Sequence, residues 1–141
     1  MSIAFTKVNK FVLNKGNGVF NLSTNQLKIA LTNTIPTVST ANQYSDLTSP
    51  LATTNLSGAT PFNITTTSFT QTSGTSKLIL ADLTLTATGA VGPFQYAVIY
   101  SDTATNKELI GFYDYGSAVN MVSGDTFTID FDGSAGVITE A

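Results

Sequence analysis

Three aspartates near the carboxyl end of the chain come closest to a chemical site by residue type and spacing. Asp130 and Asp132 are two apart in an alternating segment, so they share one face of the expected strand, and Asp125 precedes them in a turn. Such carboxylates could share a hard cation such as calcium. Calcium sites usually recruit more carboxylates, and this turn supplies mainly Ser and Gly. We therefore expect outward acids that guard the strand against edge pairing. Neighbours on one strand also cannot face each other across a cleft as a glycosidase acid and base.

Two other motifs have a simpler structural interpretation. Gly16-Asn17-Gly18 resembles the start of a glycine-rich phosphate loop, but a third glycine is missing and no βα unit follows, so a turn is expected. The glycosylation sequons at Asn21, Asn55 and Asn63 are expected from a Thr- and Asn-rich composition. We therefore predict no catalytic, cofactor-binding or metal-binding residues.

The residue types that are missing argue against most enzyme chemistry. The chain contains no His, Cys, Trp or Arg, and its six cations are all Lys. It therefore lacks thiolate nucleophiles, the commonest general base near neutral pH, and the guanidinium fork that holds phosphate and base edges. The net charge of −3 also repels nucleic acid. We expect a protein that is not an enzyme and does not bind nucleic acid.

The composition predicts one ordered domain with an unusually uncharged surface. The chain has 141 residues, 42% of them hydrophobic and only 11% charged. Thr, Ser and Asn provide the polar surface, which costs little to desolvate. This suits a domain covered by neighbouring subunits, and equally one built from many short strands. No segment reaches the roughly 20 apolar residues that span a bilayer, and no signal peptide is evident, so we expect no membrane association.

The first 22 residues differ in pattern from the rest. Phe5, Val8, Phe11 and Val12 recur at spacings of three and four, which predicts a short amphipathic helix or an arm that orders against a neighbour. The glycine-rich turn should end it. Residues 23–141 are expected to form the β-sandwich, in strands that alternate with a period of two, and the whole chain is expected to form a single domain.

The alternating segments predict an all-β fold, an antiparallel β-sandwich of jelly-roll type with a short N-terminal helix or arm. Strands are expected at Gln26–Thr32, Phe62–Thr72 with a bulge or split, Lys77–Thr88, Phe94–Tyr100, Glu108–Tyr115, Thr126–Asp132 and Val137–Thr139. In Lys77–Thr88 the inward face is expected to carry Ile79, Ala81, Leu83, Leu85 and Ala87. Phe94–Tyr100 and Glu108–Tyr115 are apolar on both faces, which is typical of central strands.

Besides the N-terminal segment, two groups of apolar residues are candidates for contact with other molecules. Val38–Pro61 is a long loop, either packed on its own domain or lying on a partner. The aromatic residues from Phe94 to Tyr115 fit a core, although a subunit interface or a ligand platform stays open. The candidate interface residues are Phe5, Val8, Phe11, Val12, Tyr44, Leu47, Leu51 and Leu56.

Three segments resemble a family of small virion proteins of tailed phages. They are LKIALTNTIP at Leu27–Pro36, GPFQYAVIYSDTATNKELIGFYDY at Gly92–Tyr115 and SGDTFTIDF at Ser123–Phe131. These are strand and hairpin sequences without a catalytic signature. The resemblance implies a capsid decoration, or cement, protein on the outside of the mature virion shell, made in the host cytoplasm.

The same resemblance implies a homotrimer whose partner is the major capsid protein. The cement-protein resemblance also implies a clamp between neighbouring capsid subunits, and we expect Phe5–Leu13 and Tyr44–Leu56 to be its contact segments. The alternatives are a tail or fibre subunit of the phage, and a carbohydrate-binding β-sandwich module.

Overall fold

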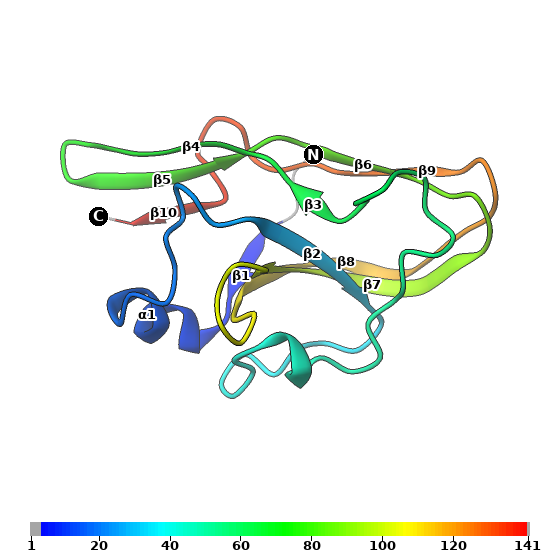
Figure 1. Ribbon diagram of the computed structural model, residues 1–141, viewed down its shortest axis with the longest axis horizontal. Coiled ribbons are helices and arrows are strands. Elements are labelled where there is room, and N and C mark those ends of the chain that lie inside the picture. The colour runs from blue at the N-terminus through cyan, green and yellow to red at the C-terminus, as the bar shows by residue number, and fades with distance from the viewer. Residues whose placement is uncertain (1–3, 141) are drawn as a thin grey trace.

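The chain folds into two β-layers, which confirms the predicted antiparallel sandwich (Figure 1). A computed structural model describes residues 4–140. One layer is a five-stranded sheet in the order β1-β8-β7-β2-β3, and the other consists of the sheets β10-β5-β4 and β6-β9. The strands are β1 Phe5–Lys7, β2 Leu27–Thr32, β3 Asn63–Ile64, β4 Thr66–Thr72, β5 Thr75–Leu80, β6 Leu83–Thr86, β7 Val91–Ser101, β8 Leu109–Met121, β9 Thr126–Ile129 and β10 Ile138–Glu140.

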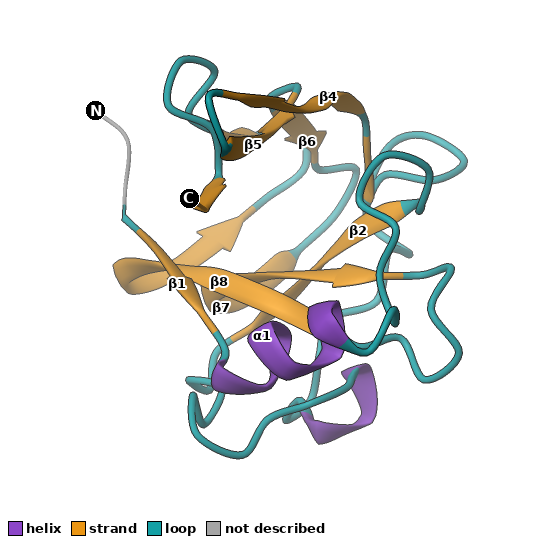
Figure 2. Cartoon of the chain, turned by 90° about the vertical axis from the view of Figure 1, so that its left-hand side faces the viewer, coloured by secondary structure: helices purple, strands orange, loops and turns teal. Residues whose placement is uncertain are grey.

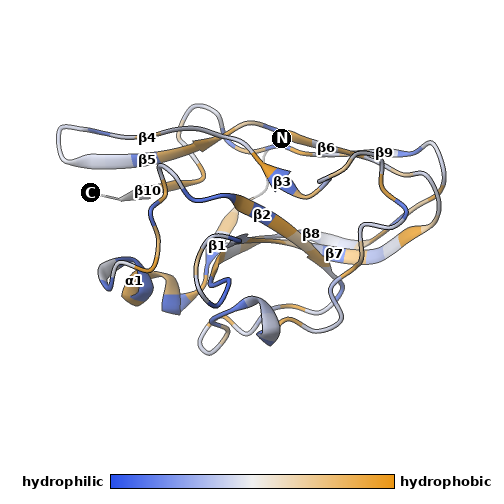
Figure 3. Ribbon diagram, viewed as in Figure 1, coloured by the Kyte–Doolittle hydropathy of each residue, from blue (hydrophilic) through white to orange (hydrophobic). Residues whose placement is uncertain are grey.

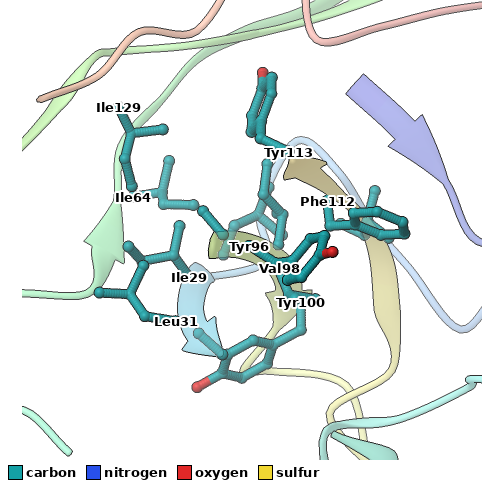
Figure 4. Packing of buried hydrophobic residues seen from close by; sticks show 14 of the residues in the cluster. Ile29, Leu31, Ile64, Tyr96, Val98, Tyr100, Phe112, Tyr113 and Ile129 are labelled. Carbon is teal, nitrogen blue, oxygen red and sulfur yellow. The ribbon is translucent and has the colours of Figure 1, made fainter. Parts of the chain in front are cut away.

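The five-stranded sheet is covered on both faces, which explains its two-sided apolar strands. Its second face lies against the helix α1 (Asn9–Gly16) and the loops that follow β2 (Figure 2). Ala97 of β7 pairs with Tyr113, whose ring contacts Phe131 after β9, so this face meets the other layer. Tyr100 points the other way and contacts Tyr44 in the loop. Figure 4 shows the Tyr113 and Tyr100 side chains pointing to opposite sides of the central strands.

The N-terminal segment forms a strand and a helix, both attached to the main sheet. β1 pairs with β8, Phe5 lying opposite Tyr113. The helix α1 ends at Gly16, and Gly18 has a φ of 77°, so the predicted glycine-rich turn is confirmed. Within the apolar spacing of three and four residues noted in the sequence, Val8 and Phe11 are the two side chains that are fully buried.

The predicted strand Lys77–Thr88 is wrong in one respect, because the structure divides it into β5 and β6. Ala81 and Asp82 lie between the two strands, and the Asp82 carboxylate accepts a hydrogen bond from the Phe131 amide at 3.0 Å. The break also shifts the alternation. Leu78 and Leu80 are buried, whereas Ala81, which was expected to face inward, is exposed.

Other strand predictions differ less from the structure. The predicted split in Phe62–Thr72 is confirmed as β3 and β4, with a register shift between Thr66 and Ser68. The strand at Gln26–Thr32 was expected to be half-buried, but Ala30 and Thr32 on its second face are buried too. This face is closed by the loop after β2, where the Thr32 hydroxyl donates to the Thr48 carbonyl at 2.6 Å.

Candidate interaction surface

The Phe5 side chain packs on the main sheet directly over Gly111. Its ring meets the Tyr113 ring edge-on, with centroids 5.2 Å apart. A Cβ at Gly111 would lie 2.6 Å from the Phe5 ring and closer still to the Thr6 carbonyl oxygen. Gly111 therefore makes room for β1, and Phe5 is half-buried in its own domain.

The helix α1 buries one side and exposes the other. Val8 and Phe11 lie in the core, where the Phe11 ring is 5.3 Å from that of Phe20. Val12 and Leu13 are 57% and 55% exposed. Within residues 4–140 the only other large apolar side chains exposed to this degree are Ile35 and Val122. Two adjacent members of this small set therefore lie on one helix.

The surroundings of this exposed face carry positive charge. Lys10 is exposed on α1, three residues before Leu13 and so on the same side of the helix, and Lys7 is exposed at the end of β1. The sequence has no acidic residue before Asp46, while four lysines precede that position. The exposed face of α1, which we define as Val12 and Leu13 flanked by Lys10, is therefore apolar at its centre and basic at its rim.

The long loop packs mainly on its own domain. The amide of Tyr44 donates to the Lys107 carbonyl at 2.9 Å, and that of Leu51 to the Leu31 carbonyl at 2.8 Å. A short 3-10 helix, η1 (Tyr44–Asp46), is the regular element within it. Leu47 and Leu56 are buried, and Tyr44 and Leu51 are half-buried.

Most of the predicted interface residues thus contribute to the domain's own core. Val12 alone among the eight is exposed, and its exposed neighbour Leu13 lies in the predicted contact segment Phe5–Leu13 but was not among the eight residues. The periodic pattern therefore selected mainly buried side chains such as Val8 and Phe11, and the exposed pair combines one residue of that pattern, Val12, with its neighbour Leu13. Contact of these residues with another subunit stays a prediction.

A pocket of about 340 Å³ opens between the loop and the main sheet. The Tyr44 and Tyr100 rings line it, with centroids 5.0 Å apart. Burial, together with Tyr44 and Asp102, raises the pKa of Tyr100 to about 12, so its hydroxyl is a neutral hydrogen-bond donor near pH 7. The pocket therefore combines aromatic surface with polar groups, as ligand sites commonly do.

The charged groups beside this pocket form a short row. The Lys28 ammonium, which also lines the pocket, is 3.8 Å from the Asp102 carboxylate. Lys107 donates a hydrogen bond to the same carboxylate. This bond, supported by the charge of Lys28, lowers the pKa of Asp102 below its ordinary value.

The three aspartates singled out in the sequence do not come together. Asp125 lies before β9, where it accepts a hydrogen bond from the Val122 amide, and Asp130 and Asp132 follow the other end of that strand. Asp132 accepts hydrogen bonds from the amides of Ser134 and Ala135, and these bonds lower its pKa. Among residues 4–140, no three acidic side chains are arranged to hold a metal ion.

The aromatic residues of β7 and β8 form core. Five of them are buried, which confirms the interpretation of this group as core: Phe94, Tyr96, Tyr100, Phe112 and Tyr113. Tyr115 is half-buried and meets the Phe127 ring edge-on at 5.0 Å. These strands therefore offer no open aromatic platform apart from the Tyr100 ring at the pocket.

The comparisons with known proteins identify no relative. Searches against protein-family models, curated proteins and solved structures give no significant match. Within residues 4–140, no helix has the length and hydrophobicity required to cross a membrane.

Proposed function

We propose that this chain is a non-catalytic virion protein of a tailed phage, a decoration protein that binds the outer surface of the major capsid shell as a homotrimer. The resemblance of β2, β7, β8 and β9 to such proteins motivates the proposal. The exposed face of α1 is the observation that supports it, because an apolar pair with a basic rim on a rigid element suits docking to another protein.

The protein would stabilise the capsid shell mechanically, by adding contacts. Decoration adds contacts at the junctions between capsid subunits, so the pressure of packaged DNA must break them as well as the contacts of the shell. A specific interface buries on the order of 1,600 Å². Because many copies act on one shell, each copy needs only modest affinity.

Binding to the shell is tested with substitutions on α1 and a matched control. The protein is mixed with expanded, DNA-free capsids and sedimented. Wild type is expected to co-sediment, and Val12→Asp/Leu13→Asp is expected to lose binding while its circular dichroism is unchanged. Val122→Asp is the control, because Val122 is 63% exposed in the β8–β9 turn, away from α1. Equal binding by all three proteins, or none by wild type, would refute the proposal.

A second candidate function is carbohydrate binding, and the pocket is the observation that favours it. An exposed part of the Tyr44 ring could stack on the apolar face of a pyranose, while Lys28 and the Tyr100 hydroxyl could bond to sugar hydroxyls. A glycan array tests this directly. Binding that free sugar competes away, and that Tyr44→Ala abolishes, would favour the module over the decoration protein.

A further inference from the structure

We propose that strand β4 is a pairing edge for a second copy of this chain, joined to it antiparallel across a two-fold axis. The contact is separate from the three-fold association proposed above. It rests on the backbone of β4, on a comparison with other open edges among the described strands, and on the register of the β4–β5 hairpin.

β4 is an open edge of the three-stranded sheet β10-β5-β4. It pairs with β5 on one side, and in the part of the chain that the structure describes no other strand pairs with it. It is seven residues long, and its sequence TTSFTQT contains neither a charge nor a proline. Figure 1 shows the β4–β5 hairpin extending past the end of the main sheet, and Figure 3 shows its β4 strand in near-neutral colours.

The other open edges have the features that prevent strand pairing. Proteins protect edges with short strands, charges, prolines and bulges, because an unprotected edge recruits another strand. Three edge strands are very short: β3 has two residues, and β10 and β1 have three each, with Lys7 in β1. β9 has four residues and lies between Asp125 and Asp130. The part of β8 that does not pair with β1 contains Asp114 and the positive-φ Gly116, and the part of β7 that does not pair with β2 contains Pro93. β6 is covered by the segment at Leu56 and Ser57. β4 has a register shift near its start, between Thr66 and Ser68, but its regular part, Ser68–Thr72, is the longest of these described edges without a charge or a proline.

The turn determines which backbone groups are free. Ser73 and Gly74 both have positive φ, 52° and 82°, as in the two-residue hairpin turn whose flanking residues exchange hydrogen bonds. Thr72 pairs with Thr75, and bonded and non-bonded pairs then alternate along the strand. The backbone N–H and C=O groups of Phe69 and Gln71 therefore point away from β5, toward the open edge.

The same pattern places the two-fold axis at Thr70. The register shift between Thr66 and Ser68 limits the regular part of β4 to Ser68–Thr72, and Thr70 is its middle. In a two-fold pair, Phe69 of each copy exchanges hydrogen bonds with Gln71 of the other. Thr70 then lies directly opposite Thr70 of the second copy, a favourable cross-strand pair with no like charges to repel.

A groove beside the edge extends this surface. Phe20, Leu22 and Phe69 line a cavity of about 450 Å³ beneath the hairpin. Phe69 is on the inner face of β4, since it pairs with the buried Leu78. A second copy along β4 would bring its own Phe69 to the same side, so apolar area would be buried in addition to the backbone hydrogen bonds.

Disulfide trapping tests the geometry, because the chain has no cysteine of its own. Facing residues of a non-bonded antiparallel pair have Cα atoms about 4.5 Å apart, within disulfide range. Thr70→Cys is expected to form a disulfide-linked dimer on mild oxidation. Thr72→Cys, equally exposed on the same strand, would face Ser68 and is expected to cross-link far less. Equal cross-linking of the two variants, or none by T70C, would overturn the pairing.

Charge variants test the association in solution. Sedimentation of wild type is expected to show an even-numbered species, and Thr70→Lys is expected to lose it because like charges would face each other across the axis. Mixing T70K with Thr70→Glu should restore the species, which also shows that both variants fold. A wild-type assembly that is three-fold only would overturn the β4 contact and leave the capsid proposal standing, because co-sedimentation tests that proposal separately.

Discussion

Gly111, a buried residue of β8, should be one of the least replaceable residues of the main sheet, because β1 packs directly on it. A methyl group at this position would collide with the Phe5 ring and the Thr6 carbonyl oxygen, so Gly111→Ala must displace β1. Releasing the half-buried Phe5 costs about 1 kcal/mol. Losing its edge-on contact with Tyr113 costs about 1 kcal/mol more. One backbone hydrogen bond between β1 and β8 adds about 1 kcal/mol.

We therefore expect Gly111→Ala to lower the free energy of unfolding by about 3 kcal/mol. Urea denaturation followed by circular dichroism measures this value. Gly16→Ala is the control, since its Cβ would meet no atom within 4 Å, and it should stabilise the helix by up to about 1 kcal/mol.

A double substitution isolates the cause. If Gly111→Ala displaces Phe5, adding Phe5→Ala should cost much less than it does in the wild-type background. An unfolding free energy for Gly111→Ala within about 0.5 kcal/mol of wild type would refute the packing of β1 described above.

Three further predictions concern the core, a buried hydroxyl and acid stability. Phe11→Ala should cost about 3–5 kcal/mol of unfolding free energy and Leu13→Ala less than about 0.5 kcal/mol, and urea denaturation that found similar costs would contradict the orientation of α1. Thr32→Val should cost about 1–3 kcal/mol by the same measurement, because the Thr48 carbonyl loses its buried donor; a neutral substitution would contradict this bond. The pKa of Asp102 is lowered in the folded state, so its carboxylate stabilises the fold above its unfolded pKa of about 3.9, and this stabilisation is lost as pH falls through the folded pKa. The difference in unfolding free energy between wild type and Asp102→Asn should therefore shrink on acid titration. A difference that stays constant with pH would be inconsistent with the lowered pKa.

The sequence was sufficient to predict the fold class because strand periodicity is a local signal. Phe127, Ile129 and Phe131 alternate with polar residues, and the last two are buried as that pattern requires. The break between β5 and β6 was not predictable in this way. It depends on a bond between Asp82 and the Phe131 amide, 49 positions away, and no local pattern reports such a contact.

The candidate surfaces were harder to predict for the same reason. Periodicity selects side chains such as Phe11 that a domain buries, so it favours core residues over contact residues. The open edge of β4 depends on which strands become neighbours, and that arrangement arises only in the assembled sheets. The Tyr44–Tyr100 contact likewise joins a loop to a distant strand.

The proposed role is to cover the outside of a phage head, and electron microscopy of the source phage particle with this subunit labelled tests that role most directly. The account predicts label distributed over the exterior of the capsid shell. Label confined to the tail or the fibres, or a particle without this chain, would contradict it.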